Sequence, residues 1–316
     1  MSQGVATVVK NAGSHFLLCE LPEWNPFPAV LRGRARLGNG SSTNPVAVGD
    51  RVAFRCDGTP DEEHPAVITE VLPRTNHLVR RSSNLSRQTQ TIAANLDRVF
   101  VVVALYFPRI KLPFLDRLLV TCEMYGIHPV ILLAKVDLYK SEVADEMQEF
   151  KAIYEGAGYD IIEISTLTGE GIEEVRRLTR DGVSLICGES GVGKSSLVKA
   201  LDPSLNPKIS DISEVHLQGR HTTSLYEMYP LCDGGYVIDC PGLRGFGLTD
   251  GVSREEVYKY FPEMLRLADQ CRFVPCTHTH EPDCAVKASL ESGEVSPERY
   301  SSYLGMLEED VKFRQK

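Results

Sequence analysis

The sequence predicts a multidomain α/β protein with a small N-terminal β-barrel, a mostly parallel sheet with helices on both faces, and a helical C-terminal module. Three observations lead to this fold class. Short strand-like segments separated by Gly, Pro and Asn fill the first part of the chain. Continuous apolar runs alternate with helical stretches in the middle, and a Cys/His cluster with a charged helix ends the sequence. We expect the three parts to span residues 1–78, 79–250 and 251–316.

The N-terminal part predicts a barrel of the oligonucleotide-binding (OB) type, because five short strands are separated by turn residues. These strands are Val5–Val9, Phe16–Leu21, Ala29–Leu37, Arg51–Cys56 and Ala66–Leu72. Arg32, Arg34 and Arg36 alternate along one strand and therefore face the same side. Arg80 and Arg81 add charge near the exit of the barrel. This face suits contacts with RNA phosphates, but a solvated polar strand face fits the composition about as well.

The middle of the chain predicts a parallel sheet, because buried apolar strands alternate with helices. The apolar runs are Arg98–Ala104, Pro129–Leu133, Ile161–Ile164, Val183–Cys187 and Tyr236–Ile238. The helical stretches between them include Leu115–Tyr125, Ser141–Glu155 and Ile172–Leu178.

A glycine-rich loop follows the fourth apolar run and precedes a helical segment. It reads Gly188-Glu189-Ser190-Gly191-Val192-Gly193-Lys194-Ser195-Ser196 and has the form G-x-x-x-x-G-K-S. Glycines let backbone N–H groups approach phosphates, and the helix N-terminus favours negative charge. Lys194 can reach the β- and γ-phosphates, and Ser195 can bind Mg²⁺. The loop predicts nucleotide binding but does not distinguish GTP from ATP, or hydrolysis from phosphoryl transfer.

A segment that can recognise the base, Ala134-Lys135-Val136-Asp137, follows the apolar run Pro129–Leu133. GTPases carry N-K-x-D here, and the Asp carboxylate accepts hydrogen bonds from the N1/N2 edge of guanine, which adenine lacks. Ala134 replaces the Asn, so one amide contact worth about 1–2 kcal/mol is lost. Ser165 and Thr166 follow the next apolar run, where a backbone N–H can reach the guanine oxygen.

Two further segments suit a magnesium ion and the γ-phosphate. Asp239-Cys240-Pro241-Gly242 has the form D-x-x-G after an apolar strand, which places a carboxylate beside Mg²⁺ and Gly242 beside the γ-phosphate. The polar segment Gly219–Ser224 precedes it, and the hydroxyl of Thr222 or Thr223 can complete the Mg²⁺ shell.

The C-terminal part contains Cys271, Cys276, His278 and Cys284 within a short span. Three thiolates and one imidazole can form a closed tetrahedral Zn²⁺ site, which is structural rather than catalytic. His280 is a second candidate imidazole. A disulfide is a poor alternative for a cytosolic chain.

The nucleotide motifs occur in a permuted order. The base segment (134–137) and second base loop (165–167) precede the phosphate loop (188–196) and the two switches (219–224 and 239–242). With a barrel before them and a Cys/His cluster after them, the chain resembles the circularly permuted, bacterial small-ribosomal-subunit biogenesis GTPases called RsgA or YjeQ. The resemblance covers almost the whole chain. Cys240 departs from the family's usual D-T-P-G.

This resemblance implies a GTPase of late small (30S) subunit maturation, which binds the subunit and its rRNA with GTP bound and leaves after hydrolysis. It also implies slow hydrolysis that the subunit stimulates, one structural Zn²⁺, and Mg²⁺ with GTP or GDP. Other assembly factors are further candidate partners, and we expect a monomer. Most GTPases orient the attacking water with a Gln shortly after D-x-x-G, but Leu243 stands there. By analogy with the family, His221 is the candidate for this role, beside Lys194 as the other catalytic residue.

Composition sets bounds on this interpretation. The net charge of −9 argues against a generally basic nucleic-acid binder but leaves room for a local basic face. An apolar run of membrane-spanning length and a signal peptide are both absent from the sequence, so we expect a cytoplasmic protein without a membrane partner. Two alternatives stay open: a nucleotide-gated RNA-binding factor whose hydrolysis is incidental, and a P-loop ATPase or kinase.

Overall fold

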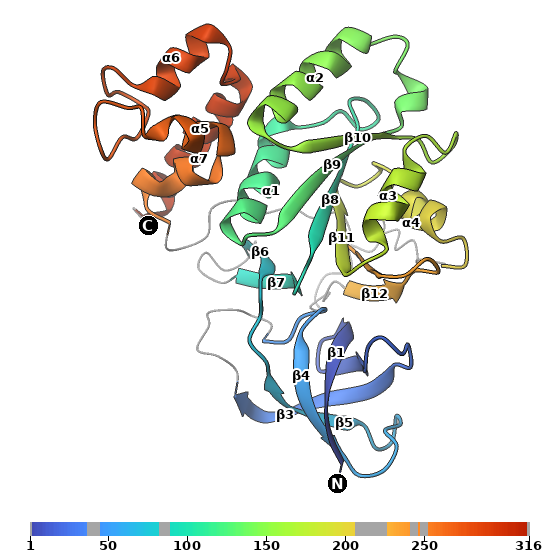
Figure 1. The fold of residues 1–316 in the computed structure, drawn as a ribbon. Coiled ribbons are helices and arrows are strands. Elements are labelled where there is room, and N and C mark those ends of the chain that lie inside the picture. Colours follow the sequence, from blue (N-terminus) through green and yellow to red (C-terminus); the bar gives the residue numbers. More distant parts are fainter. Residues whose placement is uncertain are drawn as a thin grey trace, which may run out of the picture.

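The computed structural model describes residues 2–36, 45–81, 89–205, 226–240, 246 and 252–314. Figure 1 shows a barrel at one end (blue), an α/β domain in the middle, and a helical module (orange and red) beside helices α1 and α2. The predicted fold class is confirmed. Within the described residues, no helix combines the length and apolar character that crossing a bilayer requires.

The N-terminal barrel closes through its first and fourth strands. Its strands follow the order β1-β2-β3-β5-β4, and β1 also pairs with β4. Their side chains enclose a small core that includes Val8, Leu18 and Ile68. The strands are β1 (Ser2–Ala12), β2 (His15–Cys19), β3 (Phe27–Arg36), β4 (Arg51–Cys56) and β5 (Ala66–Val71). A separate hairpin, β6 (His77–Arg81) and β7 (Thr89–Ala94), follows the barrel.

The α/β domain contains strands in the order β10-β9-β8-β11-β13-β12, and only β12 runs antiparallel to its neighbour in this domain. The strands are β8 (Arg98–Val103), β9 (His128–Ala134), β10 (Asp160–Ile164), β11 (Val183–Gly188), β12 (Tyr226–Pro230) and β13 (Tyr236–Asp239). The helices are α1 (Leu112–Met124), the 3-10 turn η1 (Val136–Leu138), α2 (Ala144–Ala157), α3 (Ile172–Thr179) and α4 (Lys194–Leu201).

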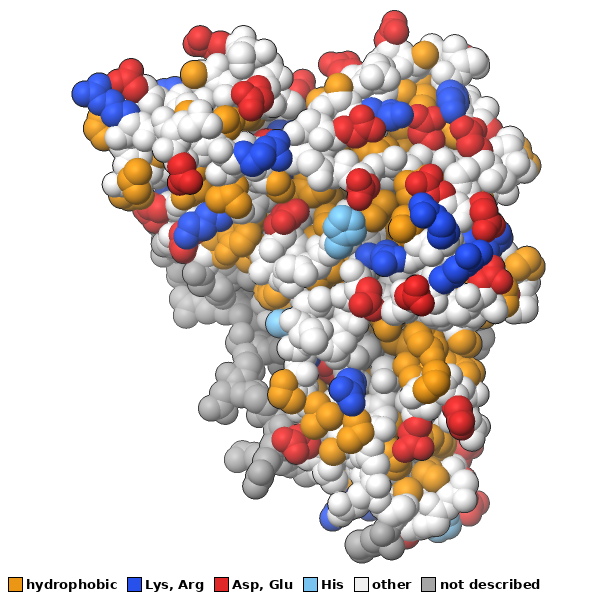
Figure 2. Space-filling model, in the orientation of Figure 1, with side chains coloured by type: hydrophobic (Ala, Val, Ile, Leu, Met, Phe, Trp, Pro, Cys, Tyr) orange, Lys and Arg blue, Asp and Glu red, His pale blue; other side chains and the backbone are white. Residues whose placement is uncertain are grey.

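Side chains of the central strands alternate between two cores, as expected for a strand buried on both faces. Along β8, Val99 and Val101 join the core that contains residues of α1 and α2. Phe100 and Val102 join the core that contains residues of α3 and α4. On the face in Figure 2, acidic and basic side chains are intermixed over the α/β domain, and hydrophobic side chains gather near its junction with the barrel.

The C-terminal module packs on α1 through a third core, to which α1 contributes Val120. The module comprises η2 (Arg254–Tyr260), α5 (Pro262–Ala268), α6 (Ala285–Ser292) and α7 (Pro297–Arg314). Arg299 of α7 is only 1% exposed and donates hydrogen bonds to Asp116 of α1 and Glu263 of α5. A buried charge cluster therefore joins the module to the α/β domain.

Candidate nucleotide site and metal centre

The candidate nucleotide-binding residues lie at the carboxyl ends of neighbouring parallel strands. Ala134 ends β9, Ile164 ends β10, Gly188 ends β11 and Asp239 ends β13. Parallel strands end at the same edge of a sheet, which is where open α/β sheets bind ligands. The structure therefore brings together three segments that are far apart in the sequence: 134–137, 188–196 and Asp239.

The phosphate loop needs glycine where it passes the neighbouring strand. A Cβ atom on Gly188 would lie 2.4 Å from the carbonyl oxygen of Val102, so a larger residue does not fit. Gly191 and Gly193 have φ angles of +81° and +105°, a region that disfavours other residues. Helix α4 begins directly after this turn at Lys194. The local sequence thus builds a tight strand-to-helix turn with its N–H groups at a helix N-terminus.

The remaining phosphate-loop residues surround this turn. Val192 is buried in the core beneath α4, and Ser195 lies half-buried in the first helical turn. Ser190 and Ser196 are exposed, and Glu189 lies 3.5 Å from the ammonium of Lys111.

Lys194 folds back over its own loop. Its Nζ donates to the carbonyl oxygens of Gly188 (3.0 Å) and Glu189 (2.8 Å). Burial lowers the pKa of Lys194, whereas Cys240 and Asp239 oppose this shift. The ammonium is thus held inside the loop that would surround the phosphates.

The carboxyl group of Asp239 is largely buried and has an oxygen available for a cation. Burial raises the pKa of its carboxyl, and Lys194 opposes the shift. Within the described residues, the buried Oδ1 atom of Asp239 has no hydrogen-bond partner. A carboxylate oxygen beside a phosphate loop is a ligand that Mg²⁺ prefers, so the residues present fit this ion.

Lys135 ties the base segment to the phosphate loop. Its Nζ donates to the carbonyl oxygens of Phe107 (2.5 Å) and Gly191 (2.7 Å). Phe107 lies in the loop between β8 and α1, so three loops of this edge share one ammonium group. The sequence predicts Lys135 as part of the base segment but gives no sign of either carbonyl partner, because backbone acceptors carry no residue signature.

Ala134 is buried, and its carbonyl accepts a hydrogen bond from the Tyr139 hydroxyl at 2.6 Å. Burial raises the pKa of Tyr139 to about 12, so this donor keeps its proton. Val136 is buried in the 3-10 turn, and Asp137 is exposed beside it. The carboxylate proposed to recognise the base is therefore accessible.

The second base loop is shaped from inside by Ser165. Its buried Oγ accepts from the N–H groups of Leu167 (3.2 Å) and Thr168 (3.1 Å). Its own N–H donates to the carbonyl of Glu170. Because those amides are used within the loop, the N–H of the exposed Thr166 is the better candidate donor to a base.

Several predicted residues lie outside the described residues. They are His221, Thr222 and Thr223 of the first switch and Gly242 of the second. Arg34, Arg36 and Arg81 lie in strands β3 and β6, but their side chains are not described. Arg32 is exposed on β3, whereas Arg80 donates twice to Gln90 Oε1, at 2.9 Å and 2.8 Å.

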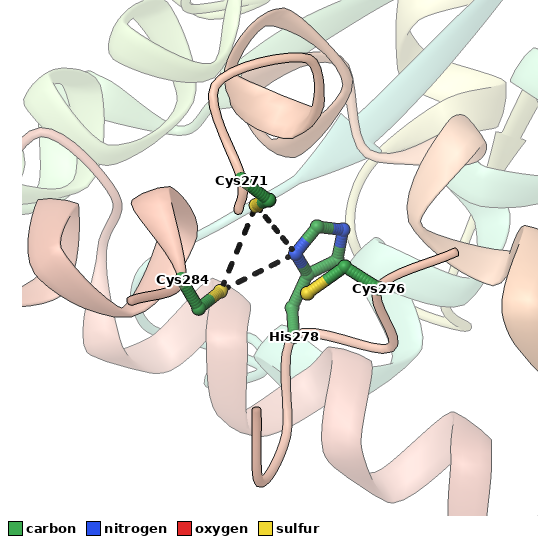
Figure 3. A group of neighbouring side chains, drawn as sticks. All are labelled: Cys271, Cys276, His278 and Cys284. Carbon is green, nitrogen blue, oxygen red and sulfur yellow. Dashed lines mark hydrogen bonds between the residues drawn. The ribbon is translucent and has the colours of Figure 1, made fainter. Parts of the chain in front are cut away.

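The structure gathers the predicted cysteines and histidine into one buried group, shown in Figure 3. The ligand atoms of Cys271, Cys276, His278 and Cys284 all lie within 4.8 Å of one another. Nδ1 of His278 lies 3.6 Å from Cys271 Sγ and 3.4 Å from Cys284 Sγ. His280 is exposed and lies outside the group. The group could hold one metal ion.

Helix α7 holds the backbone of the loop that carries Thr277 and His278. The hydroxyl of Tyr300 donates to the carbonyl of His278, and that of Tyr303 donates to the carbonyl of Thr277, both at 2.7 Å. These contacts fix the loop that carries the histidine on a helix of the same module.

Comparison with known proteins decides the family. The model of the RsgA GTPase family matches residues 71–249. The chain belongs to the RsgA GTPase family. It is 41% identical over 309 residues to the small ribosomal subunit biogenesis GTPase RsgA of Flavobacterium psychrophilum, a match that covers 98% of this chain and 91% of the relative. The RsgA protein of Bacteroides fragilis is also 41% identical, with 97% and 98% covered.

Solved structures of RsgA-like proteins show the same architecture. YjeQ from Thermotoga maritima superposes with a TM-score of 0.74 at 32% identity, covering 98% of each chain. YloQ, a circularly permuted GTPase, superposes with a TM-score of 0.70 at 26% identity, covering 99% of this chain and 96% of that one. The circular permutation predicted from the motif order is confirmed.

Proposed function

We propose that this protein hydrolyses GTP during late maturation of the small ribosomal subunit. The observation that carries the proposal is the meeting of the base segment, the phosphate loop and Asp239 at one edge of the sheet, with a carboxylate oxygen of Asp239 buried and unpartnered among the described residues. The names of the relatives, small ribosomal subunit biogenesis GTPases, support the biological setting.

In this proposal the phosphates lie against the N–H groups of residues 188–196, and Lys194 turns from its own loop carbonyls toward the β- and γ-phosphates. Ser195, Asp239 and the hydroxyl of Thr222 or Thr223 hold Mg²⁺, which neutralises phosphate charge when bound. Gly242 lies beside the γ-phosphate. Because Lys194 already sits inside the loop, little reorganisation is needed to reach the phosphates.

Base selection rests on Asp137, whose exposed carboxylate accepts the two donors of guanine. Lys135 supports this by fixing the base segment to Gly191 of the phosphate loop. A mismatched base would leave that carboxylate without a partner, which disfavours ATP. The buried Ala134 supplies no amide, so affinity is weaker than with Asn, but the guanine preference remains.

His221 is proposed to orient the attacking water, because an imidazole can accept or donate near neutral pH. Replacing His221 with Ala should lower turnover and leave nucleotide affinity nearly unchanged. An unchanged turnover would remove this residue from the mechanism.

The C-terminal module and the N-terminal barrel are both compatible with binding to the small ribosomal subunit. The Cys/His group suits Zn²⁺ in a closed, structural site, because all four ligands are side chains and all are buried. The barrel, with Arg32, Arg34 and Arg36 on one strand, is proposed to contact rRNA backbone, and Arg80 and Arg81 lie on the hairpin after it. We propose a cytoplasmic monomer that meets other assembly factors on the subunit.

The first test compares GTP with ATP as competitors for a fluorescent guanine nucleotide on the purified protein. GTP should compete far better, and equal competition would favour an ATPase or kinase. Single-turnover hydrolysis with and without small subunits is the second test. Stimulation by subunits supports the proposal, whereas binding of subunits without stimulation would indicate an RNA-binding factor with incidental hydrolysis.

A further inference from the structure

Strand β1 joins the barrel strands to the strands of the α/β domain within one sheet. Its first half, Ser2–Thr7, pairs with β4 and closes the barrel. Its second half still pairs with β2 on one side, and on the other side Lys10 and Asn11 pair with β12 of the α/β domain. The register of the pairing with β2 shifts between Val8 and Lys10, just after the pairing with β4 ends at Thr7. Bulges of this kind bend a strand, so one continuous sheet of eleven strands runs from the barrel into the nucleotide-binding domain.

The pairing of β1 with β12 lies in the same backbone row as Asp239. Lys10 of β1 lies opposite Glu227 of β12, and Glu227 lies opposite Asp239 of β13. Asp239 in turn lies beside Ile186 of β11, the strand that leads into the phosphate loop. A single backbone row therefore connects the barrel to the carboxylate proposed to hold Mg²⁺. The hairpin β12–β13 in this row connects the two candidate switch segments along the chain.

Strands β1 and β12 lie side by side (Figure 1), and side chains of both hairpin strands contact the barrel. On β12, Glu227 Oε1 accepts from Lys10 Nζ at 3.0 Å, and the two side chains are 31% and 30% exposed. On β13, Tyr236 stacks on Trp24 with ring centroids 5.8 Å apart and an interplanar angle of 27°. The Tyr236 hydroxyl also donates to the carbonyl of Pro22 at 3.4 Å.

The apolar contacts continue beneath these side chains. Val9 and Cys19 of the barrel share one buried core with Met228 and Ile238 of the hairpin. The hairpin is thus held by the barrel through backbone pairing, one ion pair, one aromatic stack and a common core.

We infer that the barrel positions Asp239 for Mg²⁺, and that Lys10 and Trp24 are positioning residues for the GTPase site. The inference rests on the proposed GTP hydrolysis. Its consequence is that a ligand which fixes the barrel, the rRNA backbone in the proposed function, changes the affinity for Mg²⁺ and GTP. By linkage, Mg²⁺ and GTP change the affinity for that RNA by the same factor.

Trp24 makes a direct test possible, because it is the only tryptophan of the chain. Mg²⁺ is titrated into the full-length protein with a non-hydrolysable GTP analogue, and Trp24 emission is followed. Nucleotide binding is measured separately by equilibrium dialysis. The emission should change with the same midpoint as Mg²⁺-dependent binding. Binding without any change in emission overturns the inference, whereas absence of binding overturns the proposed GTPase itself.

Charge reversal gives a second, independent readout. Lys10→Glu and Glu227→Lys should each raise the Mg²⁺ concentration for half-maximal GTP hydrolysis about two- to five-fold, and the double variant should restore it. The KM for GTP at saturating Mg²⁺ should stay unchanged. Lys259→Glu is the control, since Lys259 forms a surface pair at 2.9 Å with Glu256 in the C-terminal module. Equal effects of the control, or no rescue in the double variant, would overturn the inference.

Discussion

Replacing Arg299 with Met should strongly destabilise the junction between the C-terminal module and the α/β domain. The guanidinium donates from Nη1 to Asp116 Oδ1 at 2.8 Å, and from Nε and Nη2 to the two Glu263 oxygens at 2.8 Å and 3.1 Å. The exposed fractions of Arg299, Asp116 and Glu263 are 1%, 0% and 3%. Methionine has similar length, so the substitution removes the charge while largely filling the space.

The size of the expected loss of stability follows from the burial of the three charged groups. Removing one partner of a buried ion pair costs about 3–5 kcal/mol, because the remaining charge stays in a medium that solvates it poorly. Here two carboxyl groups lose their shared cation. The guanidinium also lies 4.8 Å from the ring centroid of Phe261 and 5.4 Å from that of Tyr159, and these contacts disappear too. A loss of this size lowers the unfolding temperature by on the order of 10 °C.

The loss of stability in the Arg299→Met variant should depend on pH. Burial already raises the pKa of Asp116, and Arg299 opposes that shift. In the Arg299→Met protein the opposing effect is gone, so folded Asp116 holds its proton more tightly than unfolded Asp116 does. Folding of the variant then takes up a proton, and its stability rises as the pH falls through the raised pKa. The destabilisation should therefore be smaller at pH 6 than at pH 8.

Calorimetric unfolding at both pH values tests this, with Arg272→Met as the matched control. Arg272 pairs with Asp283 at 2.6 Å in the same module, but the two side chains are 68% and 63% exposed. An exposed pair contributes less than about 1 kcal/mol. Equal shifts in the two variants, or an Arg299→Met shift that is independent of pH, would refute the reasoning.

Three further predictions concern the nucleotide and metal sites. Gly188→Ala should abolish GTP binding in fluorescence titrations, since its Cβ would lie 2.4 Å from the Val102 carbonyl; normal binding would contradict the described loop. Asp239→Asn should raise the Mg²⁺ requirement of hydrolysis at least about tenfold, and an unchanged magnesium titration would exclude this residue as a ligand. Cys276→Ser should lower the unfolding temperature and the bound zinc measured by atomic absorption, whereas Cys56→Ser, outside the metal group, should change neither.

Much of the fold and site follows from local sequence patterns. The alternation of apolar runs and helical stretches predicts a parallel sheet, and the structure confirms it. Glycine spacing predicts the phosphate loop, because a tight turn beside a neighbouring strand tolerates no Cβ at Gly188. The short spacing from Cys271 to Cys284 predicts the metal group, because ligands close in sequence are brought together by one loop.

Other features depend on contacts between distant segments. Arg299 and Asp116 are 183 residues apart, and a charged residue in a helix reads as solvent-exposed until the partner is known. Strand β1 extends beyond the predicted Val5–Val9 because its first half pairs with β4 of the barrel and its second half pairs with β12 of the α/β domain. The hairpin β6–β7 was not predicted, and the expected boundary at residue 78 falls inside β6.

The circular permutation gives a physical reason for the two accessory modules. In the permuted order, the hairpin β12–β13 and Asp239 come last in the α/β domain and lead directly to the C-terminal module. The barrel holds β12 through β1, and the C-terminal module holds α1 through Arg299 and Asp116. Helix α1 follows the loop whose Phe107 carbonyl accepts from Lys135, which also contacts Gly191 of the phosphate loop. Each module is therefore connected to a different side of the same candidate nucleotide site. A large ligand that contacts both modules would constrain the magnesium side and the base side together, which a ligand of either module alone would not.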